Sequence, residues 1–385
     1  MMRNQGQLTR AVCSLLFCLF TFFYVYSYQC DLIAYAQMVL SEGMTHFDRT
    51  VGALLITVAL YIVHLFVYGL VRPHNRYIAL TYFPSLLILT VFTDIPKNIS
   101  EHFSFGAWLW VLPLLLLLFV GLVAFLRQWS ARWQVSTSSF FHDAWVNLAI
   151  MAAMFFLVGW VSNGDELFHR QLRMERKVIN GDYEAALEID KQTAKREPAI
   201  TQLAAFSLSQ QAALGDRFFE YPVTNKSIAP NQPSLFFFVP QQVINLVRNA
   251  ECCKDDYELT DLLLERRLND FARKVKKCYN DSIMPKHYRE ALAIFNKSDD
   301  AKLLAQEEEE ALKAEMEKAK KERRGKRSSK KSEKKGKSIH PLDSIMSERY
   351  RTYQLLLESS SDKKVVYNLS RKYFSNTYWH YYHFK

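Results

Sequence analysis

Two polar side chains near the N-terminus have the chemistry that a membrane-side active site needs. Asp31 lies just outside an apolar stretch at residues 8–28, and His46 lies a short distance further along the chain. A carboxylate acts as a general base or holds a metal ion, and an imidazole exchanges protons near neutral pH. These residues raise the hypothesis of a membrane-embedded enzyme that modifies an envelope polysaccharide or lipid. A lone carboxylate in so short a loop is a nonspecific signal.

The sequence contains none of the common catalytic motifs. The patterns H-E-x-x-H, G-x-S-x-G and C-x-x-C are absent, and so is a glycine-rich phosphate loop. His380 and His383 have no neighbouring cysteine or carboxylate that would complete a metal site. We therefore predict no enzymatic activity, no cofactor and no bound metal ion. The membrane enzyme that uses Asp31 and His46 is the alternative.

The most specific pattern is a tetratricopeptide-like segment. In such a repeat a glycine closes the turn between two helices, a small residue lets the helices approach closely, and a proline follows the second helix. The positions with these offsets are Gly181, Tyr183, Ala186 and Pro198. Gly215 recurs 34 residues after Gly181, which is the period of this repeat. The second copy is interrupted by Pro222, and a chance match to an ordinary amphipathic helix is the alternative.

Helical periodicity continues in residues 259–275 and 285–295, so residues 164–300 are predicted to form a tetratricopeptide-like α-helical repeat domain. Stacked helix pairs share a core and leave an extended face that commonly binds proteins. Within this region, residues 230–240 contain three consecutive phenylalanines and are expected to form a loop that docks on the membrane or on another helix.

The N-terminal part is predicted to be a membrane domain over residues 1–163, in an all-α protein. Five apolar stretches are long enough to cross a bilayer as helices, at 8–28, 51–71, 78–93, 106–126 and 144–162. The third is the shortest and contains Pro84, which a membrane helix tolerates when its neighbours satisfy the freed carbonyl. For the first stretch, a cleaved signal peptide is the alternative.

Loop charges predict the orientation of these spans. With the N-terminus inside, the inner segments carry six basic residues, namely Arg3, Arg10, Arg72, Arg76, Arg127 and Arg132, and the outer loops carry Arg49 and Lys97. Positive charge gathers on the cytoplasmic side, so an inner-membrane protein with a periplasmic C-terminal half is expected. The span interiors lack the ionisable residues that mark transport pathways. His64 and Asn147 are expected to hydrogen-bond to neighbouring helices or to line a path.

The positive charge of the chain is concentrated in one segment. The net charge of the 385 residues is +10, and residues 313–337 hold 13 Lys and Arg against 4 Glu. Residues 301–340 are therefore predicted to be a coiled-coil or disordered insertion that is either solvated or attracted to anionic lipid or polymer. Without a recognisable module or interleaved aromatic residues, nucleic-acid binding is not expected.

The C-terminal part, residues 341–385, is predicted to contain closing helices at 342–358 and 365–374. It ends in an unusually aromatic segment, residues 378–384, which would cap the preceding helices or rest on a membrane surface. Cys278 could form a disulfide with Cys252 or Cys253, and free buried thiols are the alternative.

Five stretches carry a resemblance to a known family: Tyr35–His46, Phe103–Trp110, Gly215–Pro222, Met284–Leu292 and the aromatic ending. The chain resembles uncharacterised bacterial multi-pass membrane proteins with a tetratricopeptide-like C-terminal half, and it looks like a compact member. The resemblance implies architecture and location, and it transfers no catalytic residue. The leading hypothesis is a scaffold or docking protein that presents its helical domain to protein partners of the cell envelope.

Overall fold

The chain folds into helices that form two compact units. Unit 1 is Met1–Arg173 and unit 2 is Met174–Lys385. The computed structural model describes residues 2–97, 99, 106–132, 140–191, 197–223, 228, 236–250, 253–279, 284–298 and 344–384. No strand occurs within these residues, which confirms the predicted all-α class. The predicted charged insertion, with its basic segment 313–337, lies outside the described residues.

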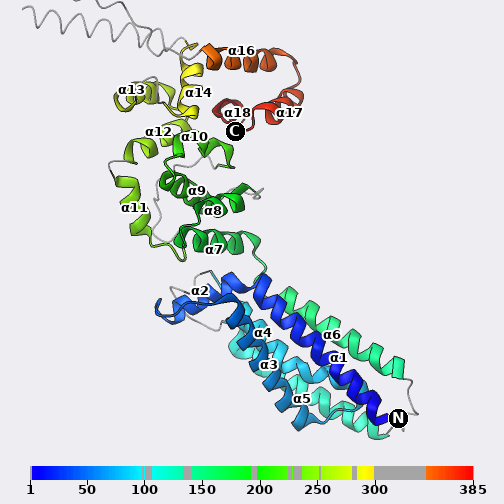
Figure 1. Cartoon of the computed structure of the whole chain (residues 1–385). Coiled ribbons are helices and arrows are strands. Elements are labelled where there is room, and N and C mark those ends of the chain that lie inside the picture. Colours follow the sequence, from blue (N-terminus) through cyan, green and yellow to red (C-terminus); the bar gives the residue numbers. More distant parts are fainter. Residues whose placement is uncertain are drawn as a thin grey trace, which may run out of the picture. The chain divides into compact units, whose positions relative to one another are not determined.

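Unit 1 contains the predicted apolar helices (Figure 1). They are α1 (Met2–Phe23) with the π-helical turn η1 (Tyr24–Tyr28), α3 (Arg49–Val71), the 3₁₀-helix η2 (Asn75–Tyr82) with α4 (Phe83–Thr93), α5 (Trp108–Arg132) and α6 (Phe140–Val161). Five segments are long and apolar enough to cross a membrane, as the sequence predicts. A shorter helix, α2 (Cys30–Leu40), lies between the first and second of them.

The third apolar segment, Asn75–Thr93, lies at the centre of unit 1. In its most apolar stretch of 18 residues, 61% of the residues are buried, against 6–28% in the corresponding stretches of the other four segments. Pro84 lies in the first turn of α4, where a helix does not need the missing N–H group. The apolar segment changes from the 3₁₀-helix η2 to α4 just before Pro84, so the proline does not interrupt an α-helix.

Polar side chains link this irregular segment to neighbouring helices. The Asn147 side chain of α6 accepts a hydrogen bond from the Ala79 N–H at 2.8 Å and donates to the Asn75 carbonyl at 2.9 Å. The Ser85 hydroxyl donates to the Leu60 carbonyl of α3 at 2.9 Å. His64 Nδ1 lies 3.3 Å from the Thr81 hydroxyl. His64 and Asn147 therefore make the predicted hydrogen bonds between helices.

The outer surface of unit 1 is apolar. Helix α5 is the most exposed of the five apolar segments, with 6% of the residues in its most apolar stretch buried. Leu114, Leu117 and Val120 are each more than half exposed. A surface of this kind is unfavourable in water and matches the hydrocarbon of a bilayer. Length, composition and surface together support a multi-pass membrane protein.

Unit 2 is built from short helices that pack against their neighbours in the chain. They are α8 (Tyr183–Lys191), α9 (Pro198–Gln210), α10 (Leu214–Arg217), η3 (Phe218–Glu220), α11 (Gln241–Asn249), α12 (Lys254–Leu264), α13 (Leu268–Cys278), α14 (Lys286–Phe295), α16 (Ser344–Glu358), α17 (Lys363–Phe374) and α18 (Tyr378–Phe384). Helices α8 and α9, α12 and α13, and α16 and α17 form contacting pairs (Figure 1). Helix α7 (Glu166–Ile179) contributes its N-terminal part to unit 1 and its C-terminal part to unit 2.

One hydrophobic core joins these pairs. It extends from Met174 and Val178 of α7, through Leu203 of α9 and Phe271 of α13, to Trp379 of α18. Each of these side chains is at most 5% exposed. Removal of this much aromatic and aliphatic surface from water is the main stabilising contribution to unit 2.

Candidate functional site

The repeat positions near the start of unit 2 have definite local roles. Gly181 forms the turn between α7 and α8 with φ +74°, a conformation that strains any residue with a Cβ atom. Ala186 is fully buried in α8, which packs against α9, and Tyr183 is the first residue of α8. Pro198 is the first residue of α9, after α8 has ended at Lys191.

Gly215 has a different role from Gly181. It lies inside α10 and is buried, whereas the left-handed residue between α9 and α10 is Ala212, with φ +53°. A Cβ atom on Gly215 would lie 2.7 Å from Cβ of Pro285 and 2.9 Å from Cζ of Tyr288. The glycine therefore allows close approach of α10 to α14. Gly181 and Gly215 are thus 34 residues apart but serve different purposes, a turn with positive φ and a close helix contact.

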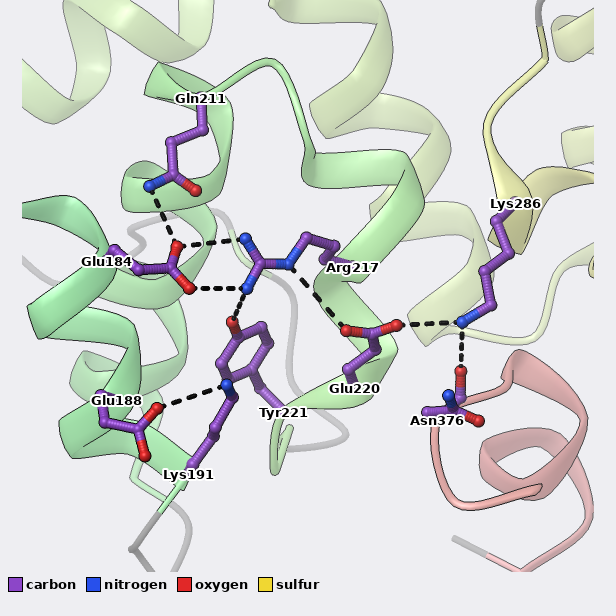
Figure 2. A network of polar contacts seen from close by, with 9 residues as sticks. All are labelled: Glu184, Glu188, Lys191, Gln211, Arg217, Glu220, Tyr221, Lys286 and Asn376. Carbon is purple, nitrogen blue, oxygen red and sulfur yellow. Dashed lines mark hydrogen bonds and ion pairs between the residues drawn. The ribbon is translucent and has the colours of Figure 1, made fainter. Parts of the chain in front are cut away.

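A network of charged side chains links these helices (Figure 2). Arg217 of α10 forms a bidentate pair with Glu184 of α8, with N–O distances of 2.9 and 3.1 Å. It also donates to the Tyr221 hydroxyl at 2.9 Å. The hydrogen bonds from Arg217 hold the pKa of the Glu184 carboxyl below its usual value. Bidentate geometry of this kind orients both side chains.

The same network reaches the C-terminal part of unit 2. Glu220 accepts from Lys286 Nζ at 3.0 Å, and Lys286 Nζ also donates to the Asn376 carbonyl at 2.8 Å (Figure 2). The acidic groups of this network are thus neutralised by Arg217 and Lys286. These contacts fix the positions of α8, α10, α14 and the segment before α18 relative to one another.

A buried hydrogen-bonded pair, His287 and Glu290, anchors the aromatic C-terminus. His287 Nδ1 and Glu290 Oε2, both on α14, are 2.9 Å apart, and both side chains are fully buried. Glu290 Oε2 also accepts from the Tyr378 N–H at 2.8 Å, and the Glu290 carbonyl accepts from Trp379 Nε1 at 2.8 Å. The aromatic ending is therefore a cap on the preceding helices, one of the two predicted roles.

The loop with three phenylalanines docks on α7. Glu175 of α7 is fully buried, and one of its carboxylate oxygens accepts from the N–H groups of Phe237, Phe238 and Val239 at 2.8, 2.5 and 3.2 Å. The sequence predicts docking on a membrane or a helix, and the structure identifies the helix. The roles of Glu175, Arg217 and Glu290 could not be predicted from the sequence because Phe237, Glu184 and Tyr378, which they bind, are distant in the chain.

The remaining sequence candidates are dispersed. His380 Nδ1 lies 2.8 Å from the Ser370 hydroxyl, and His383 Nδ1 lies 3.0 Å from the Trp379 carbonyl. No group of metal-ligating side chains occurs among the described residues. Cys253 and Cys278 form no disulfide within the described residues, and Cys252 lies outside them.

Asp31 and His46 have separate environments in unit 1. Asp31, in the first turn of α2, is 9% exposed and accepts from Arg173 Nε at 3.2 Å. His46 is exposed and lines a cavity of about 900 Å³ between α2, α3 and α4. Asp31 is not among the lining residues of this cavity. The structure therefore does not bring the two predicted residues together in one site.

Asp190 of α8 is a buried carboxyl group in unit 2. The residue is 1% exposed, and its Oδ2 atom has no hydrogen-bond partner among the described residues. Burial disfavours the charged form and raises the pKa of Asp190 to about 7. This group makes the stability of α8 sensitive to pH.

Asp190→Asn is expected to remove a pH-dependent loss of stability. Below pH ~4 the carboxyl is protonated in both the folded and the unfolded chain. Between pH ~4 and the folded pKa of about 7, the unfolded chain releases its proton while the folded carboxyl retains it, so stability falls as pH rises. Thermal unfolding of the full chain in detergent at about pH 5 and about pH 8 measures the difference. Glu188→Gln, on the exposed face of α8, is the control, and an unchanged pH dependence in Asp190→Asn would contradict the assignment.

Removal of Glu290 is expected to weaken unit 2 much more than removal of Glu184. Glu290→Ala leaves the buried His287 ring and the Tyr378 N–H without their hydrogen-bond partner, which costs roughly 1–3 kcal/mol for each group. Glu184→Ala removes a pair whose carboxylate side chain is 61% exposed, so the cost is about 1 kcal/mol or less. Amide hydrogen exchange of α14 and α18, compared with that of α8, distinguishes the two effects. Equal effects would show that burial does not determine the strength of these links.

Comparison with known proteins agrees with the resemblance inferred from the sequence. No curated protein and no solved structure matches the chain. Residues 255–385, which include α12–α14 and the C-terminal cap of α16–α18, match the model of a family described as "Family of unknown function (DUF6057)".

Proposed function

We propose that this protein is a membrane-anchored scaffold that presents unit 2 to protein partners at the cell envelope. The observation that carries the proposal is the paired-helix construction of unit 2. Gly181 turns the chain between α7 and α8, and Ala186 is buried in α8, which packs against α9. Helix pairs that share a core form an extended surface suited to protein binding.

The polar links support this role because they fix the relative positions of helices. The Arg217 network joins α8 and α10 to α14, and Glu290 joins α14 to α18. A preorganised surface binds a partner with a smaller loss of conformational entropy. Bilayer contact is assigned to unit 1, whose five apolar helices supply the anchor.

Helix α11 provides the most direct place to test partner binding. Its Ile244 side chain is 3% exposed and belongs to the core of unit 2, whereas Leu246 is 74% exposed and Val243 is 44% exposed. Exposed aliphatic side chains on a helix that is already anchored by its other face are suitable contact points for a second helix.

We also propose that the protein lies in the bacterial inner membrane with its N-terminus in the cytoplasm and unit 2 in the periplasm. The proposal combines five membrane-crossing helices with the excess of basic residues on alternate loops. A periplasmic unit 2 would meet envelope proteins and no nucleic acid. The basic segment 313–337 remains predicted to attract anionic lipid or polymer.

A membrane-embedded enzyme acting on polysaccharide or lipid remains the alternative. It is supported by His46, which shares its cavity with the carboxylates of Asp48 and Asp94. Asp31 is better suited to a structural role, since it is paired with Arg173. If Asp31→Ala and His46→Ala abolished the cellular function while unit 2 was dispensable, the enzyme would replace the scaffold.

A photo-crosslinking amino acid at position 246 is expected to capture a discrete protein partner in intact cells. Val243→Asp should strongly reduce this adduct, because it places a charge beside the same apolar surface without entering the core. The crosslinker at Arg351, exposed on α16, is the control position. The absence of any adduct at position 246, with the protein at its normal level and correctly inserted, would contradict docking through α11.

A further inference from the structure

The cavity of about 900 Å³ in unit 1 has the length of one bilayer leaflet. Its wall on α3 runs from Val51 to Val63. At about 1.5 Å per residue this is about 18 Å, slightly more than half of the ~30 Å hydrocarbon layer. On α4 the wall is formed by the C-terminal turns, from Ile88 to Phe92. The cavity therefore starts at the α2 end of the spans and ends near mid-membrane.

The walls of this cavity are apolar, and they form a groove whose floor is closed. Leu60 of α3 and Leu89 of α4 are at most 4% exposed, so the two helices meet beneath the groove. Leu55 and Phe92 are 63% and 64% exposed and flank it. Water is unfavourable between such side chains, and an empty groove would forfeit dispersion contacts. A hydrocarbon chain satisfies both conditions.

One end of the groove is polar. Gln37, His46, Asp48 and Asp94 line it together with Trp108. Asp94 accepts from Trp108 Nε1 at 2.8 Å, which is the amphipathic arrangement expected at a membrane interface. Within the described residues, neither Asp48 nor Asp94 forms an ion pair with a basic side chain. The mouth therefore carries negative charge and favours an ammonium group over an anion.

We propose that this groove binds a membrane phospholipid with an ammonium-bearing headgroup. One acyl chain lies between α3 and α4, and the headgroup lies beside His46 and Asp94. An acyl chain gains no hydrophobic free energy by moving from the surrounding lipid into the groove. The affinity for the lipid therefore depends on the fit of the chain to the groove and on the contacts of the headgroup with the polar mouth. The site is independent of the scaffold role of unit 2, and it involves none of the residues that the scaffold test alters.

Ala59 offers a way to fill the groove selectively. It lines the cavity, is exposed in the isolated unit and does not belong to the buried core. Ala59→Trp places an indole in the path of the acyl chain, and Leu55→Trp is a second variant with the same purpose. Val58→Trp is the matched control, because Val58 is the neighbouring residue, is 48% exposed and is not part of the lining.

The test uses the full-length protein in nanodiscs that contain either phosphatidylethanolamine or phosphatidylglycerol with a photoreactive group on one acyl chain. Labelled peptides are mapped by mass spectrometry, and Leu117 on the outer face of α5 reports ordinary bilayer contact. Labelling of residues 51–63 should exceed that of Leu117. In Ala59→Trp and Leu55→Trp it should fall about fivefold or more, the factor that corresponds to roughly 1 kcal/mol, whereas Val58→Trp should retain it.

Phosphatidylethanolamine should label the groove more strongly than phosphatidylglycerol, and Asp94→Asn should reduce that preference while retaining an acceptor for Trp108. Labelling no stronger than at Leu117, or unchanged in both groove-filling variants, would overturn the site and identify bulk lipid contact only. A preference for phosphatidylglycerol would overturn the headgroup assignment. Protection of the groove from both lipids would instead indicate that a segment of the chain itself covers it.

Discussion

Hydrocarbon offers no hydrogen-bond partner to the backbone, and unit 1 is organised by this constraint. Its third apolar segment begins as a 3₁₀-helix and therefore lacks part of the regular α-helical bonding pattern. Asn147 supplies an acceptor and a donor to η2 at the point where the helix is irregular. Surrounding helices bury this segment, so the apolar segment with the 3₁₀-helix is also the most buried of the five. The parity of the span count, and with it the side of the membrane assigned to unit 2, depends on this segment.

Unit 2 uses polar groups in two distinct ways. Glu175 and Glu290 are fully buried, and they accept from three and from one backbone N–H, respectively, of segments distant in the sequence. The Arg217 network is partly exposed and adds several weaker links, which join α8, α10 and α14. These two carboxyl groups favour the observed docking of the phenylalanine loop and of the aromatic C-terminus, because a buried acceptor that lost its N–H partners would be costly. This fixed arrangement is what a docking surface requires.

Local features of the fold could be predicted from the sequence. Apolar length and composition predict the membrane helices, and Gly181 predicts a turn that has the expected positive φ. Long-range contacts could not be predicted in the same way. Gly215 is spaced like a repeat glycine, yet its requirement comes from Pro285 and Tyr288, which follow about 70 residues later. Asp31 and His46 are close in sequence, but Asp31 forms an ion pair with Arg173 of α7, whereas His46 lines the cavity.

The sidedness of unit 2 tests the account most directly. Reporters that are active only in the periplasm or only in the cytoplasm, fused after Ser162 and after Lys385, would determine on which side of the membrane each position lies. The five-span arrangement predicts that the periplasmic reporter is active at both positions and the cytoplasmic reporter at neither. Activity of the cytoplasmic reporter at both positions would contradict the account, since it would show either that one apolar helix does not cross the membrane or that the N-terminus lies outside the cytoplasm.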